Sequence, residues 1–90
     1  MMYPSMTLND DTEITHSEMK PDGKVKVYIE TPDDFGGFHN ATCWLPDYIW
    51  EDVKGYSDTE VKYFNEFVHS VAHIIIELSQ TGGFGSNSNF

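Results

Sequence analysis

The sequence predicts an α+β fold in which a three-stranded antiparallel sheet, an N-terminal β-hairpin plus one strand, packs on one long C-terminal helix. Three observations support it: a turn between two extended segments, alternating apolar and polar residues in two segments, and a capped amphipathic pattern near the C-terminus. A chain of 90 residues makes one domain. We place that domain at residues 12–81, after an N-terminal arm over 1–11 that can be partly ordered and before a flexible tail over 82–90, rich in glycine, serine and asparagine.

The hairpin is expected at segments 12–19 and 24–31, on either side of the turn Lys-Pro-Asp-Gly at 20–23. Proline presets one turn dihedral, and glycine accepts a positive φ. In the second segment valine and isoleucine alternate with lysine, tyrosine and glutamate, which puts one stripe toward the core and a mixed charged stripe outside. The outer face should be solvated or covered by another molecule.

The third strand is expected at 38–45, after an acidic loop over 31–37. Its apolar residues Ala41, Cys43 and Leu45 should face one way. Pro46 ends it. The next segment, 47–53, could form a short helical turn or another strand, and we assign it to a helical turn.

The helix is expected from about Asp58 to about Ser79, because Ser57 and Glu60 have the spacing of a capping box. Apolar residues at spacings of three and four make a continuous seam, the expected core face. They are Val61, Phe64, Val68, Val71, Ile75 and Leu78. Further apolar residues flank this seam, namely Phe67, Ile74, Ala72 and Ile76. This apolar arc is wider than one sheet contact needs, so a homodimer contact or a partner groove could use the excess.

The charge of the chain is strongly negative: fifteen acidic residues against five lysines and no arginine give a formal net charge of −10. Nucleic acids are held by lysine and arginine, so direct nucleic-acid binding is not expected. The same field repels an anionic membrane surface and favours encounter with a basic protein. Acidity that only keeps a small protein soluble is an equally weighted alternative.

No catalytic motif is present in the sequence, and the domain has little room for a cofactor, so neither an enzyme nor a bound cofactor is expected. The single cysteine, Cys43, suits a reducing compartment. With no secretory signal at the start of the sequence, we expect a cytoplasmic protein of a bacterial cell or a phage-infected host. Cys43 alternates with apolar residues, which favours a core position over a nucleophile.

Two loops combine carboxylates with aromatic residues, as interfaces do, and are the predicted partner-binding site. One loop contains Asp33, Asp34 and Phe35. The second loop contains Asp47, Tyr48, Trp50, Glu51 and Asp52. The alternative, given equal weight, is that Trp50 and Phe35 complete the core while the acids face water.

Four residues on one stripe of the helix, Glu66, His69, His73 and Glu77, are the candidate metal ligands. Ser70 stands where a zinc-protease motif has glutamate, so hydrolytic zinc chemistry is not supported. A solvated polar face is the favoured interpretation of this stripe.

Together these features predict a small acidic non-enzymatic binding protein, an inhibitor that presents carboxylates to a basic, nucleic-acid-binding protein surface as a DNA mimic. In general character the chain is similar to phage-encoded anti-defence proteins, including anti-CRISPR proteins, although no motif is matched and no functional residue is carried over. The alternatives are an oligomeric regulatory or antitoxin-like scaffold domain and a metal-binding module that uses His69 and His73.

Overall fold

The fold is a five-stranded antiparallel sheet followed by one helix, in a computed structural model that describes residues 2–8 and 11–81. The elements are β1 (Met2–Thr7), β2 (Glu13–Ser17), β3 (Val25–Pro32), β4 (Phe38–Leu45), β5 (Ile49–Lys54) and α1 (Asp58–Thr81). The strands lie in the sheet in their sequence order, so each pairs with its neighbours in the chain. The α+β class is as expected, but the prediction of three strands is wrong. The predicted tail over 82–90 lies outside the described residues.

The first unpredicted strand, β1, lies within the segment assigned to an N-terminal arm. It pairs with β2 from Met2, opposite Ser17, to Thr7, opposite Glu13. Between Pro4 and Met6 the register shifts, because β1 advances by two residues while β2 advances by one. Such a β-bulge interrupts the period of two that identifies strands in a sequence.

The second unpredicted strand, β5, replaces the helical turn expected at 47–53. Between the pairs Thr42 with Glu51 and Asn40 with Lys54, β5 advances by three residues and β4 by two. The extra residue gives β5 a bulge near Asp52, which has a positive φ of 55°. Irregular backbone and a high content of acidic residues hid this strand from pattern analysis.

The predicted hairpin and third strand are confirmed. β2 pairs with β3 across the turn, and β3 pairs with β4 along its whole length. The alternation also has the expected direction, since the six apolar residues predicted to face the core are at most 1% exposed. They are Val25, Val27 and Ile29 of β3 and Ala41, Cys43 and Leu45 of β4.

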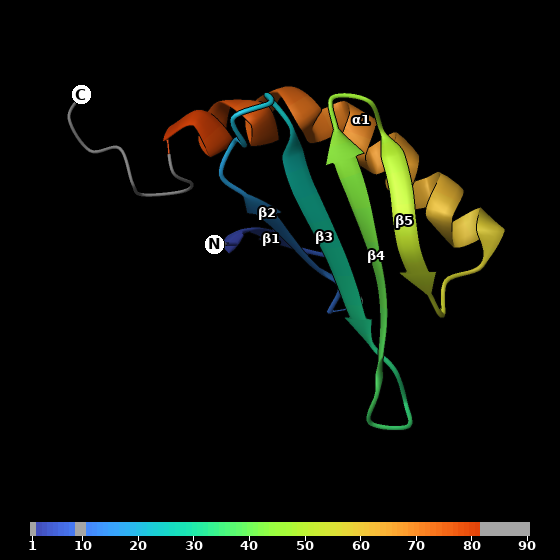
Figure 1. The fold of residues 1–90 in the computed structure, drawn as a ribbon. Coiled ribbons are helices and arrows are strands. Elements are labelled where there is room, and N and C mark those ends of the chain that lie inside the picture. The colour runs from blue at the N-terminus through green and yellow to red at the C-terminus, as the bar shows by residue number, and fades with distance from the viewer. Residues whose placement is uncertain (1, 9–10, 82–90) are drawn as a thin grey trace.

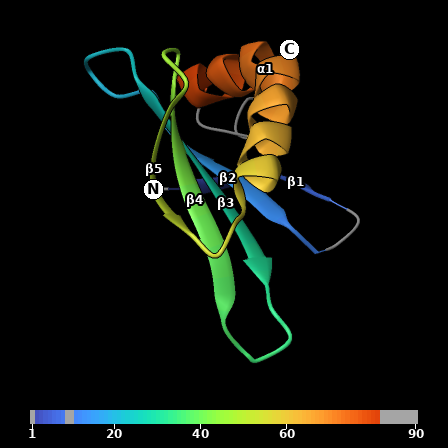
Figure 2. The same cartoon turned by 90° about the vertical axis from the view of Figure 1, so that its right-hand side faces the viewer.

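The helix α1 begins as the sequence predicts, with both capping-box hydrogen bonds in place. The backbone amide of Glu60 donates to Ser57 Oγ at 3.2 Å, and the backbone amide of Ser57 donates to Glu60 Oε1 at 2.8 Å. Figures 1 and 2 show α1 lying on one side of the sheet. Its buried residues Phe64, Val68, Ala72 and Ile75 join the buried residues of the strands in one core.

The apolar residues that flank the helix seam are mostly used within the chain. Ala72 is buried, and Phe67 and Ile76 are half-buried against the core. Ile74 is exposed. Homodimerisation through the helix therefore remains a prediction with little extra apolar area behind it. Within the described ranges, no helix combines the length and the hydropathy that crossing a membrane requires.

Candidate functional site

The face of the sheet opposite α1 carries a concentration of carboxylates and aromatic rings, and we call it the open face. Strand alternation defines it, because its residues lie between the buried ones along each strand. Its residues are Thr7, Glu13, Thr15, Lys26, Tyr28, Glu30, Pro32, Phe38, Asn40, Thr42, Trp44, Ile49, Glu51 and Lys54. Phe38 and Ile49 are each at least half exposed, at 55% and 50%. The open face thus offers apolar groups together with three glutamates, Glu13, Glu30 and Glu51, and with two lysines, Lys26 and Lys54.

Two carboxylates of the open face are held by aromatic hydrogen-bond donors. The indole Nε1 of Trp44 donates to Glu51 Oε1 at 2.7 Å, and the Tyr28 hydroxyl donates to Glu30 Oε2 at 3.1 Å. Partial burial raises the pKa of Tyr28, and the hydrogen bond to Glu30 raises it further. Tyr28 therefore stays a neutral donor at physiological pH. These bonds fix the orientation of negative charges that would otherwise move freely.

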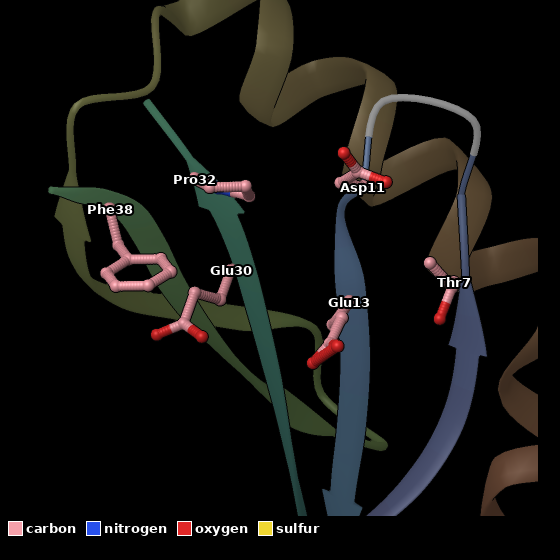
Figure 3. Close-up of a pocket in the computed structure, with 6 residues that line it drawn as sticks. All are labelled: Thr7, Asp11, Glu13, Glu30, Pro32 and Phe38. Atoms are coloured by element: carbon pink, nitrogen blue, oxygen red, sulfur yellow. The ribbon is translucent and has the colours of Figure 1, made fainter. Parts of the chain in front are cut away.

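At one end of the open face, a row of polar residues runs across three strands. Thr7 of β1 lies opposite Glu13 of β2, and Glu13 lies opposite Glu30 of β3. Figure 3 shows the two glutamates side by side, with the Phe38 ring next to Glu30.

This row lines a pocket of about 480 Å³. We call it the end pocket, and it is lined by Thr7, Asp11, Glu13, Glu30, Pro32 and Phe38. The two ion pairs of the described residues, Lys24 with Asp47 and His39 with Asp33, involve none of its three carboxylates. The charges of the end pocket therefore have no cation of the described chain paired with them.

The first predicted loop forms the ordered turn between β3 and β4. Asp33 Oδ1 accepts hydrogen bonds from the backbone amides of Phe35 at 2.8 Å and Gly37 at 2.9 Å. The bond from Gly37, followed by that from Phe35, lowers the pKa of Asp33. Phe35 is 96% exposed, and Asp34 is also exposed. The turn, which extends beyond the sheet in Figure 1, thus presents an uncovered phenylalanine.

The second predicted loop lies at the opposite end of the sheet, and its aromatic residues contact α1. Tyr48 stacks on His69 with ring centroids 3.6 Å apart and planes 7° apart. Trp50 Nε1 donates to Asn65 Oδ1 at 2.9 Å. Both rings also pack against the core, which Trp50 was expected to complete; Phe35, the other residue expected there, is 96% exposed instead.

The acids of this second loop are divided among different surroundings. Asp47 pairs with Lys24 at 3.8 Å, Glu51 lies on the open face, and Asp52 is exposed at the bulge. The structure does not bring the two predicted loops together. It places Glu51 on the same face as Glu13 and Glu30, two glutamates that sequence reasoning did not select.

Counting outward from Pro21 and Asp22 would have identified part of this face. Two-residue hairpin pairing places Glu13 opposite Glu30, as observed. Thr7 and Asp11 could not be found in this way, because their places depend on β1 and on the chain leading out of it.

The four candidate metal ligands Glu66, His69, His73 and Glu77 are all exposed on α1. His69 is engaged by the Tyr48 ring. Throughout residues 2–8 and 11–81, no group of three histidine, cysteine or acidic side chains is placed to hold a metal ion.

Cys43 is fully buried in the core, and burial raises the pKa of its thiol to about 12. A nucleophilic cysteine needs an accessible thiolate, so Cys43 is not suited to that role. The core position predicted from strand alternation is confirmed.

No family model matches this chain, and neither the curated proteins nor the solved structures include a significant match to it.

Proposed function

We propose that this chain is a small acidic non-enzymatic binding protein that uses its open face to occupy a basic, nucleic-acid-binding surface of another protein, and so acts as an inhibitor. The observation that carries the proposal is that carboxylates held by aromatic hydrogen bonds lie on the sheet face that α1 leaves uncovered.

Electrostatics favours this class of partner. The net charge of −10 accelerates encounter with a basic surface, and orders of magnitude in association rate can come from such steering. Fixed carboxylates keep their direction on binding, so less conformational entropy is lost than with free side chains. In both respects the open face resembles the ordered phosphates of a nucleic acid.

The aromatic residues supply a second source of affinity. Trp44 and Tyr28 are hydrogen-bonded to Glu51 and Glu30, and Phe38 and Ile49 add exposed apolar area. Buried aromatic residues are frequent interface hot spots, while charges around them control specificity and association rate. The open face combines both.

The edges of the sheet are less suited to binding than its face. Both edge strands, β1 and β5, carry a β-bulge. A bulge disrupts the row of free backbone groups that an added strand would need. We therefore place the partner on the open face rather than beside β1 or β5.

Comparative affinity capture tests the proposal. The wild type is compared with Glu30→Gln/Glu51→Gln, which removes two open-face charges, and with Glu66→Gln/Glu77→Gln, which removes two exposed helix charges. A basic protein should be retained by the wild type and the helix variant and lost from the open-face variant. The complex should weaken steeply with salt and be displaced by duplex DNA. Retention of the same proteins by all three chains, or affinity independent of salt, would rule out the proposed function.

A further inference from the structure

We infer that the end pocket receives an arginine side chain from the basic partner, and this inference rests on the proposed function. The juxtaposition behind it is a pair of glutamates directly opposite each other, beside an exposed phenylalanine ring, on a sheet face that the described residues leave uncovered.

The carboxylates of the end pocket form no ion pair within the described residues, so a cation of a partner can pair with them. Glu13 and Glu30 are cross-strand neighbours, and their Cβ atoms are expected about 5 Å apart. Asp11 adds a third carboxylate to the lining. Like charges at this separation repel each other, and no lysine or histidine of the described residues forms an ion pair with them. A bound cation would replace this repulsion by attraction.

The shape and lining of the end pocket favour a guanidinium group over a smaller ion. Its volume of about 480 Å³ is many times that of a single ion or water molecule. Phe38 and Pro32 give it an apolar side, on which the three-carbon stem of arginine can lie. A planar guanidinium can stack on the Phe38 ring while donating to carboxylates on two strands.

Alternative cations fit less well. Calcium takes about six to eight oxygen ligands, whereas the described residues contain no group of three side chains placed to hold a metal ion. A lysine ammonium is a compact, strongly hydrated charge without a planar donor array. The end pocket offers two carboxylates and the face of an aromatic ring together, which suits the planar guanidinium group with its several N–H donors.

The end pocket is continuous with the rest of the open face. The Tyr28 hydroxyl donates to Glu30, so the pocket and the aromatic centre of the face share a hydrogen bond. A partner lying on Tyr28 and Trp44 could therefore place one arginine between Glu13 and Glu30. Charge complementarity with a chain of net charge −10 selects a basic segment as that partner.

Titration with defined peptides, followed by amide NMR shifts, tests the inference without the natural partner. The probe is acetyl-Gly-Arg-Gly-amide, and the matched probes replace arginine by lysine or by citrulline, its neutral analogue. We expect saturable shifts at Glu13, Glu30 and Phe38, with arginine binding at least about tenfold tighter than citrulline, because charge-assisted bonds are lost in the neutral peptide. Absence of saturable shifts, or equal affinity for the lysine or citrulline peptide, overturns the inference.

Matched variants identify the residues. Glu13→Gln/Glu30→Gln should weaken arginine-peptide binding at least about tenfold, and Phe38→Leu should weaken it about threefold, because it removes the ring but retains apolar bulk. Glu66→Gln/Glu77→Gln also removes two negative charges and should bind as the wild type does. Equal affinity in all these proteins overturns the inference. If the arginine peptide does not bind in the end pocket but a basic protein is still captured, the inference fails and the proposed function stands. Arginine binding in the end pocket without any basic partner would remove the proposed function alone.

Discussion

Replacing Glu13 by glutamine should stabilise the folded chain, although it removes part of the candidate binding site. Glu13 and Glu30 lie directly opposite each other on β2 and β3, and both side chains point to the open face. Like charges at directly opposite positions of an antiparallel pair are destabilising. Glutamine keeps the length and polarity of the side chain and removes only the charge.

The expected gain follows from the separation of the two charges. If the Cβ separation of about 5 Å is taken as the distance between the charges, two unit charges repel by about 0.8 kcal/mol at the dielectric constant of water. Screening in about 0.1 M salt lowers this value, so we expect about 0.5 kcal/mol in the free energy of unfolding. For a domain of this size, that gain corresponds to a rise in Tm of about 2–4 °C.

Thermal and urea unfolding of the wild type, Glu13→Gln and Glu66→Gln measures this gain. Glu66 is exposed on α1, so Glu66→Gln controls for the general effect of one charge fewer. The excess stability of Glu13→Gln over Glu66→Gln should shrink in 1 M salt, where the screening length falls to about 3 Å. If Glu13→Gln is less stable than the control, or if its advantage does not depend on salt, the reasoning is wrong.

Three further predictions concern other elements. Ser57→Ala should lower the free energy of unfolding by about 1 kcal/mol in urea titrations, because the Glu60 amide loses its acceptor. Ser57→Asp should retain most of this stability, because aspartate also accepts a hydrogen bond at this position. Cys43 of the folded protein should not react with a thiol reagent. Because burial raises the pKa of its thiol to about 12, the stability that the neutral thiol contributes should be lost as pH rises from about 8.5 toward that value. Cys43→Ala should remove this pH dependence from alkaline unfolding curves. Phe35→Ser should leave the Tm unchanged, because the ring is 96% exposed, and should weaken partner binding in titration calorimetry; unchanged binding would remove Phe35 from the interface.

The parts of the fold that could be predicted are those in which local pattern and tertiary environment agree. β3 and β4 lie in the middle of the sheet with one face on the core, so their apolar residues alternate strictly. The start of α1 could be predicted because a capping box needs residues only three apart. In each case the information lies within a few residues of the structure it determines.

The edge strands could not be predicted, because their bulges break the alternation that pattern analysis detects. In β1 the shift follows Pro4, and in β5 it accompanies the positive φ of Asp52. Part of the candidate site could not be predicted for the same reason. Glu13 and Glu30 become neighbours through strand register, and Thr7 joins them only through β1. The hairpin turn predicts the pair of glutamates, but no local pattern brings Thr7 beside them.

Unfavourable features of the open face also support a binding role for it. On the helix side the core apolar residues are buried, Ser57 and Glu60 cap α1, and Trp50 has a hydrogen-bond partner, while the buried His16 Nε2 has none among the described residues. On the open face, two glutamates oppose each other and Phe38 is left exposed. Local violations of this kind concentrate at functional sites, where a partner supplies what the chain lacks. If Glu13→Gln proves more stable and binds its partner less well, the repulsion and the binding site are the same feature.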